Sequence, residues 1–423
     1  MSTSPATVRV LSAVRAQGAP ISKAEIVALT KLSLAAVTEH VDILCANGLL
    51  LAQDVGASSG GRKPKLYGFN PSAGCILAVD LESTHVNVAL TDFGLRVLYA
   101  TSSDEIDVTR GPETTLLHIK DLLMEVLKAA AVKPELIKGL GMGVPGPVSF
   151  MQALPTSLSL MPGWDSYPVR DFWKEHFDCP SFVDNNVHTM ALGERALAPA
   201  SAPKEMIFVK IGNGIGAGIV CDGAIYRGAT EHAGEIGHTH IGHDALCYCG
   251  NRGCLEAIAG GRAIARQAEE HARAGGSERL AAVLANKGSL RLSDVIRAVQ
   301  ESDPIAVALI RESGSAVGRV LAGLVNFFNP SHIVVGGGVA QAGDVLLAAI
   351  RQAVYQYALP LSTRTLTIRQ STIGGQVGVL GAALLALDRA LEPVRDSHQT
   401  VLRTHTPDEN VTKISRRVRA RHG

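Results

Sequence analysis

Three apolar runs that end in glycines constrain the fold of this chain most. They read "GLGMGVPGPV" at residues 139–148, "MIFVKIGNGIGAGIVCDGAI" at 206–225 and "HIVVGGGV" at 332–339. Each is typical of a buried strand that ends in a tight turn. Helical stretches such as residues 315–328 separate the runs. This alternation predicts an α/β fold, in which glycine-rich strand ends are common places for a ligand.

A further stretch, residues 75–101, predicts two or three consecutive antiparallel strands. The chain has 423 residues, enough for two or three domains. Its net charge of +1 excludes a polycation, so any nucleic-acid binding has to come from a local patch. No apolar stretch reaches the length of a membrane span, and no signal peptide is recognisable, so a cytoplasmic protein without membrane contact is expected.

The first 70 residues predict two helices joined by a tight turn. Ser22 and Glu25 form a capping box, so a helix starts there. The turn is "TKLS" at residues 30–33, and its serine can cap the next helix. Apolar residues recur on that next helix at helical spacing and are predicted to form its buried face: Leu34, Val37, Val41 and Leu44. This helix is predicted to end at Asn47–Gly48.

The opposite face of this helix carries small and polar side chains, which let a helix approach base edges. After it, residues 49–55 and 65–70 can pair as a hairpin around a basic, glycine-rich loop. Together these elements predict a winged helix-turn-helix that binds double-stranded DNA in the major groove. The candidate DNA contacts are Ser33, Ala35, Thr38, Glu39, His40, Arg62, Lys63 and Lys65. The alternative is a small protein-interaction domain with a solvated basic loop.

Three of the seven cysteines fall within eight residues of the stretch "CYCGNRGCLE". They have the close spacing of metal ligands: Cys247, Cys249 and Cys254. Three histidines lie just upstream: His238, His240 and His243. Three thiolates and one imidazole make a closed tetrahedral site, so a structural Zn²⁺ is predicted. A redox pair is the alternative, but the spacing is CxC rather than CxxC.

Residues 227–260, "RGATEHAGEIGHTHIGHDALCYCGNRGCLEAIAG", resemble the signature of the ROK family of repressors, sugar kinases and uncharacterised reading frames. The family's repressors often carry a basic G-R-x-P wing, like Gly61-Arg62-Lys63-Pro64 here. The resemblance implies a winged helix-turn-helix at residues 1–71 and a two-lobed, actin/hexokinase-like ROK body at 72–392. A basic tail at 393–423 follows.

The resemblance also implies site residues. The metal ligands would be His238 and the three cysteines. His238 lies nine positions before Cys247, where the family usually has ten, so His240 or His243 stays open as the fourth ligand. The implied sugar contacts, in the cleft between the lobes, are Asn185, Asn186, Glu235, His238 and Glu256. A carboxylate suits this role because it accepts hydrogen bonds from two adjacent hydroxyls. Leu160 stands where the family often offers an asparagine to the sugar.

Two parts of a ROK kinase are replaced in this sequence. The kinases carry a D-x-G-G-T phosphate loop, but here residues 80–84 read "DLEST", with Glu82 and Ser83 at the glycine positions. Glu82 should repel a phosphate. The kinases' catalytic aspartate is matched by Asn186, an amide that is no useful proton acceptor. Asp184 lies two residues earlier and could act only if the loop shifted.

These observations predict a sugar-responsive transcriptional regulator, a repressor of carbohydrate uptake or metabolism genes, and not an enzyme. Its expected partners are a DNA operator, a sugar or sugar-phosphate effector, and further copies of itself in a homodimer or homotetramer. A co-repressor would use the same parts. The alternatives are an active ATP-dependent sugar kinase with a fused DNA-binding domain, and a zinc-dependent interaction protein without a small ligand.

Overall fold

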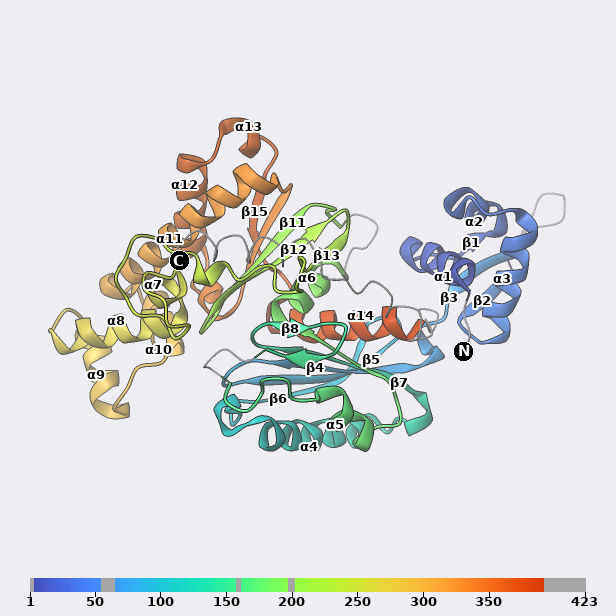
Figure 1. The fold of residues 1–423 in the computed structure, drawn as a ribbon, viewed down its shortest axis with the longest axis horizontal. Helices are drawn as coiled ribbons and strands as arrows, with labels where there is room; N and C mark the ends of the chain where they lie inside the picture. Colours follow the sequence, from blue (N-terminus) through green and yellow to red (C-terminus); the bar gives the residue numbers. More distant parts are fainter. Residues whose placement is uncertain (1–3, 55–64, 157–160, 197–201, 392–423) are drawn as a thin grey trace, which may run out of the picture.

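The computed structural model describes residues 4–54, 65–156, 161–196 and 202–391 (Figure 1). A small N-terminal domain stands beside a larger body in which two sheets are separated by a pair of helices. Within the described ranges, no helix is both long enough and apolar enough to cross a bilayer. The predicted tail at 393–423 lies outside the described residues.

The N-terminal domain is a winged helix-turn-helix. Its helices are α1 (Pro5–Gln17), α2 (Lys23–Thr30) and α3 (Leu34–Ala46). Its strands, ordered β1-β3-β2, are β1 (Ile21–Ser22), β2 (Leu50–Asp54) and β3 (Lys65–Phe69). β2 and β3 pair antiparallel and form the base of the wing. Arg62 and Lys63 lie outside the described residues.

Local hydrogen bonds fix the helix-turn-helix. Glu25 accepts from the backbone N–H of Ser22 at 2.7 Å, and Ser22 accepts from that of Glu25 at 3.3 Å, so the capping box is confirmed. Lys31 ends α2 in the left-handed conformation, at φ 58°. Ser33 then accepts from the N–H of Ala36 at 3.2 Å and caps α3, as predicted.

The prediction for the buried face of α3 is right for three residues and wrong for the fourth. Val37, Val41 and Leu44 are buried, whereas the Leu34 side chain is 60% exposed. Leu34 is the first residue of the helix, and burial begins one turn later. An apolar group is therefore present on the face that carries the candidate DNA contacts.

The first sheet of the body has the order β10-β7-β4-β5-β6. Its strands are β4 (Cys75–Leu81), β5 (Val86–Asp92), β6 (Val97–Ser103), β7 (Ile137–Val144) and β10 (Ser181–Asn185). The first three are antiparallel, as predicted, and β7 and β10 add in parallel on the other edge of β4. α4 (Pro112–Ala130) and α5 (Val169–His176) cover one face (Figure 1). A short ribbon of β8 (Val148–Ser149) and β9 (Leu154–Pro155) follows β7.

The second sheet repeats this arrangement, with three antiparallel strands and two parallel ones in the order β13-β12-β11-β14-β15. Its strands are β11 (Met206–Ile211), β12 (Ile215–Cys221), β13 (Ala224–Tyr226), β14 (His332–Gly336) and β15 (Thr367–Gln370). The helices of this lobe are α7 (Glu256–Ala259), α8 (Gly261–Arg273), α9 (Glu278–Lys287), α10 (Leu292–Gln300), α11 (Pro304–Phe328), α12 (Asp344–Tyr357) and α13 (Pro360–Thr363). The two similar lobes form the expected sugar-kinase-like body.

Two helices, α6 (Asn186–Ala196) and α14 (Val377–Leu391), cross between the sheets (Figure 1). The crossing leaves no room for side chains. A Cβ atom on Gly381 would lie 1.6 Å from the carbonyl oxygen of Thr189, and one on Gly193 would lie 1.9 Å from that of Val377. Since α14 packs on the first sheet and α6 on the second, this crossing joins the two lobes.

The same helix α14 also receives the N-terminal domain. One continuous apolar cluster runs from Val10 and Leu11 of α1 to Val379 and Ala383 of α14. The N-terminal domain is therefore packed on the helix that joins the lobes.

A Gly381→Ala substitution should lower the free energy of unfolding by about 2–3 kcal/mol, because the added methyl group overpacks the crossing. Chemical denaturation followed by circular dichroism measures this. Gly323→Ala on α11 is the matched control, since a Cβ atom there meets nothing within 4 Å. It should be neutral or stabilise by up to about 1 kcal/mol. Equal stability of the two variants would contradict the close crossing.

Candidate functional site

A cavity of about 110 Å³ lies between the lobes, at the ends of β4, β10 and β11. Both lobes contribute polar side chains to its wall. They are Glu82, Ser83, Thr156, Asn185, Asn186, Lys210, Asn213, Glu235, Tyr248, Glu256 and Arg262. Four of the five predicted sugar contacts are among them, all except His238. Leu160 lies outside the described residues.

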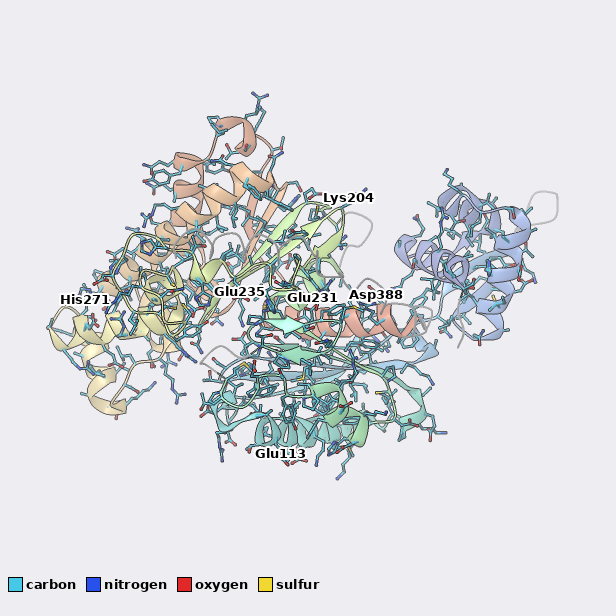
Figure 2. The ribbon with its side chains drawn as sticks, in the orientation of Figure 1. Glu113, Lys204, Glu231, Glu235, His271 and Asp388 are labelled. Atoms are coloured by element: carbon cyan, nitrogen blue, oxygen red, sulfur yellow. The ribbon has the colours of Figure 1, made fainter. Side chains whose placement is uncertain are left out.

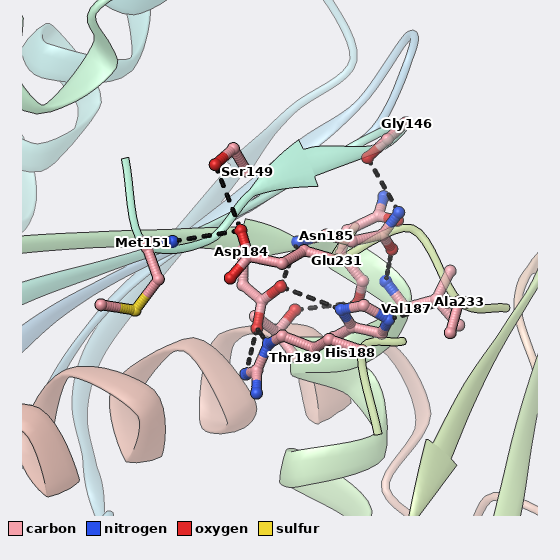
Figure 3. Close-up of polar contacts among 12 residues, drawn as sticks. Gly146, Ser149, Met151, Asp184, Asn185, Val187, His188, Thr189, Glu231 and Ala233 are labelled. Atoms are coloured by element: carbon pink, nitrogen blue, oxygen red, sulfur yellow. Dashed lines mark hydrogen bonds and ion pairs between the residues drawn. The ribbon is translucent and has the colours of Figure 1, made fainter. Parts of the chain in front are cut away.

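Both asparagines are fixed by the backbone. Asn185 donates to the carbonyl of Gly146 at 2.8 Å and accepts from the N–H of Val187 at 2.7 Å, at the start of α6 (Figure 3). Asn186 donates to the carbonyl of Leu81 at 3.0 Å. Asn186 therefore ties the start of α6 to the end of β4, and Asn185 ties it to the loop after β7.

Two carboxyl groups face the cavity from the second lobe. Glu256 accepts from the N–H of Ile215 at 2.7 Å, which orients it. Burial, and then the charge of Glu256, raise the pKa of Glu235 to about 7. Burial also raises the pKa of Glu256. With a pKa of about 7, the carboxyl group of Glu235 can both donate and accept hydrogen bonds near neutral pH, which suits a ligand rich in hydroxyls.

The cysteine cluster closes around one histidine. The ligand atoms of His238, Cys247, Cys249 and Cys254 all lie within 4.8 Å of one another. His238 Nδ1 lies 3.6 Å from the sulfur of Cys247, and the sulfurs of Cys249 and Cys254 are 3.7 Å apart. Zinc bonds of about 2.0–2.3 Å put tetrahedral donors roughly 3.5–3.8 Å apart. The donor set and its spacing therefore fit a four-coordinate metal ion.

The other two histidines have different partners. His240 Nδ1 donates to the carbonyl of Arg252 at 3.0 Å, and His243 Nδ1 accepts from the N–H of Ala245 at 3.2 Å. Only His238 of the three joins the cysteines in the described part of the chain.

Tyr248 is a site residue that the sequence analysis missed. Its hydroxyl lies 3.1 Å from Nε2 of His238, on the opposite side of the ring from the cysteines, and it lines the cavity. The hydrogen bond between Tyr248 and His238 thus connects the cysteine cluster to the cavity. The sequence did offer one signal for Tyr248. It lies between two predicted metal ligands, Cys247 and Cys249, and therefore close to the site.

A buried ion pair joins the first sheet to the loop before the cysteine cluster (Figure 3). Asp184 on β10 pairs with the guanidinium of Arg227 at 2.6 Å and with Nδ1 of His188 at 2.9 Å. Burial would raise the pKa of Asp184, but the hydrogen bond and charge of His188 and the charge of Arg227 hold it below its usual range. His188 Nε2 in turn lies 3.2 Å from the carbonyl oxygen of Ala233. Neither Arg227 nor His188 stood out in the sequence.

The stretch "DLEST" contacts the second lobe directly. Glu82 pairs with Lys210 at 3.2 Å, and Asn213 donates to Ser83 at 3.1 Å. Both contacts cross the cavity mouth from the end of β4 to the end of β11. Asp80 lies buried behind them, with Oδ1 lacking a hydrogen-bond partner among the described residues.

The candidate DNA contacts lie on one domain but differ in exposure. Ala35 and Glu39 on α3 and Lys65 on β3 are exposed, and Ser33 caps α3. Thr38 and His40 are half-buried on α3. His40 Nδ1 lies 3.2 Å from the hydroxyl of Thr7, so this histidine also ties α3 to α1.

Comparison with known proteins identifies the relatives of the chain. The model of the ROK family matches residues 76–389. The xylose repressor of Caldicellulosiruptor bescii is 30% identical over 374 residues, which cover 88% of this chain and 92% of that protein. The crystal structure of a ROK family transcriptional regulator, a homologue of the E. coli Mlc protein, matches with a TM-score of 0.76 at 28% identity. The match covers 91% of this chain and 95% of the regulator's chain.

A kinase of known structure matches a shorter part of the chain. The ROK family glucokinase from Streptomyces griseus, in complex with glucose and AMPPNP, has a TM-score of 0.66 at 27% identity. The match covers 74% of this chain and 99% of the kinase.

Asp80 generates a pH-dependent prediction. Burial, and then the charge of Glu82, raise its pKa to about 7, although Lys210 opposes the shift. The folded protein therefore keeps a proton that the unfolded chain loses near pH 4, and stability falls as the pH rises from about 4 to about 7. Asp80→Asn should remove this loss and gain about 2 kcal/mol relative to wild type at pH 8, and less at pH 4. Urea denaturation at both pH values measures the difference. The exposed Asp121→Asn is the control, and a pH-independent gain would refute the assignment.

Proposed function

The chain belongs to the ROK family, and on that basis we propose that it is a sugar-responsive, DNA-binding transcriptional repressor of carbohydrate genes. One observation carries this proposal. A winged helix-turn-helix packs on α14, the helix that joins two lobes around a carboxyl-lined cavity. The repressor and the regulator match nearly the whole chain, whereas the glucokinase matches a smaller share.

The proposed sugar site is the cavity between the lobes. Glu235 and Glu256 offer oxygen atoms to adjacent hydroxyls of a sugar ring, and Asn185 and Asn186 form the opposite wall. His238 would act from behind Tyr248, whose hydroxyl stands between the imidazole and the cavity. A sugar hydroxyl reaches His238 only when Tyr248 moves aside.

We propose that this cleft binds a sugar without phosphorylating it. Glu82 stands at the mouth of the cavity and is paired with Lys210, so a carboxylate and its counter-ion fill the place that a kinase needs for phosphates. Asn186, at the position of the catalytic base, donates its amide to a backbone carbonyl. Asp184 is held by Arg227 and His188 and is not among the described residues that line the cavity.

We propose zinc as the ion of the cysteine cluster. Three thiolates and an imidazole at tetrahedral spacing suit Zn²⁺ better than the oxygen-preferring cations. With four protein ligands the ion has no open position, so it would stabilise the loop that carries Glu235 and Tyr248 rather than react with a substrate.

A dimer or tetramer stays a prediction, and one surface fits it. Phe327 at the end of α11 is 89% exposed, and Leu359 and Leu361, next to it, are also exposed. The N–H of Leu359 donates to Asn326 at 2.8 Å, so these apolar groups share one end of the second lobe. A second copy covering this end would present two recognition helices to paired half-sites.

The function is tested by fluorescence anisotropy on labelled DNA from upstream of the coding region, at fixed salt. D-xylose, D-glucose and their phosphates are added in turn, and one of them should weaken DNA binding by about fivefold or more. Glu235→Ala should abolish this response and leave sugar-free DNA affinity within about twofold, because the residue lies far from the DNA-binding domain. Arg62→Ala should weaken DNA binding about threefold to tenfold and leave sugar binding intact.

Glu113→Ala, on the outer helix α4, is the control for Glu235→Ala (Figure 2). DNA binding that no sugar shifts would contradict the sugar response. ADP release in a coupled assay with these sugars would instead establish the kinase alternative.

Metal analysis tests the cofactor. Protein purified without chelator should contain about one zinc per chain, because the four ligands form one closed site. Cys254→Ser should lose the metal, lower the melting temperature and weaken the sugar response. Cys221→Ser, outside the cluster, should keep the metal. A metal-free wild-type protein would overturn the zinc proposal.

A further inference from the structure

We propose that the ring of Phe150 couples the sugar site to the DNA-binding domain. This inference rests on the proposed function and names the route by which the effector acts. The route has three contacts in series, from residues 227–235, here called the sugar loop, to α14 and then to α1. Figure 2 shows Glu235, Glu231 and Asp388 one after another along this direction.

The sugar loop is held to the turn after β8. The guanidinium carbon of Arg227 lies 3.9 Å from the centroid of the Phe150 ring. Glu231 accepts hydrogen bonds from the hydroxyl of Ser149 at 3.1 Å and from the N–H of Met151 at 3.4 Å (Figure 3). Three successive residues of the turn thus contact the loop that ends in Glu235.

The same ring is held from the other direction by α14. The guanidinium carbon of Arg389, in the last turn of that helix, lies 4.7 Å from the Phe150 centroid. Both distances are within the range of a cation–π interaction. The buried carboxylate of Asp184 neutralises Arg227, so the ring can hold two cations close together. Any displacement of Arg227 changes the surroundings of Arg389 through one shared ring.

The neighbour of Arg389 in the sequence makes the contact to the DNA-binding domain. Asp388, adjacent to Arg389, pairs with Arg15 of α1 at 2.5 Å. α1 packs on the recognition helix α3, and the Thr7–His40 contact links the two helices at 3.2 Å. The last turn of α14 therefore contacts the sugar-loop side through one residue and the DNA-binding side through its neighbour.

A cavity lies beside the apolar contact between α1 and α14. Its volume is about 740 Å³, and both Arg15 and Asp388 line it. This space leaves room for the N-terminal domain to tilt on α14 while the apolar contact is kept. A shift at the end of α14 is thus able to redirect α3 relative to the body.

These contacts suggest a two-state mechanism. A sugar that draws Glu235 toward its hydroxyls moves the sugar loop, and Phe150 then repositions Arg389 and the end of α14. By linkage, DNA that selects one orientation of α3 must change the sugar affinity by the same factor.

The first test uses the sugar-free protein and hydrogen exchange measured by mass spectrometry. Arg227→Met releases the sugar loop from the ring, and it should speed amide exchange in α1 and in the last turn of α14 by about threefold or more. In a Phe150→Leu background, the same Arg227→Met change should have no further effect on those peptides. Unchanged exchange in α1, or an equal increase in both backgrounds, would overturn the proposal.

The second test measures the response itself. Phe150→Leu keeps an apolar side chain of similar size but removes the aromatic ring. Its separate affinities for D-xylose and for the upstream DNA should stay within about twofold of wild type. The sugar-induced change in DNA affinity should shrink by about fivefold or more. A full response in this variant would overturn the proposal.

Phe177→Leu is the control for loss of a ring, because Phe177 lies at the end of α5, away from the route. The two tests separate the possible failures. If neither D-xylose nor D-glucose nor their phosphates change DNA binding by the wild-type protein, the proposed function fails, while the exchange experiment still decides the coupling.

Discussion

The rest of this structure depends on the crossing of α6 and α14 at glycine distance. Two similar lobes could be linked by a flexible hinge alone, but here the backbones of two helices meet, with Gly193 and Gly381 at the contact. Close backbone approach makes the crossing a fixed pivot, because no side chain can rearrange there. α14 then serves both as the partner of α6 and as the support for the DNA-binding domain. The helix α14 therefore contacts the first sheet, α6 and the DNA-binding domain at once.

Charge is distributed around this pivot in pairs. Arg227 and His188 hold the pKa of the buried Asp184 below its usual range, whereas burial without a direct cationic partner raises the pKa of Asp80 to about 7. Glu82 takes the nearby lysine instead. These pairings determine which acidic side chains can contact a ligand in the cavity. Glu235 and Glu256 remain, and neither has a basic side chain as a direct partner among the described residues.

The sequence predicts much of the architecture and less of the site. Caps, turns and the alternation of strands and helices are local, so the helix-turn-helix and most strands of both sheets follow from spacing, whereas β10 and β15 were not predicted. The metal cluster follows because its ligands lie within 17 residues of one another in the sequence. Leu34 was misplaced because periodicity does not say where along a helix its neighbours begin. Arg227 and Phe150 were missed because their roles come from partners distant in the chain, which no local pattern records. Tyr248 was missed although its partner, His238, lies only ten residues away.

The contact between Glu82 and Lys210 has a consequence for what the molecule can report. The glucokinase of known structure holds both glucose and AMPPNP. In this chain the pair of Glu82 and Lys210 already bridges the two lobes without a nucleotide. Under the proposed function, a cleft bridged in this way responds to sugar alone, so the change in DNA binding would be independent of the ATP level of the cell.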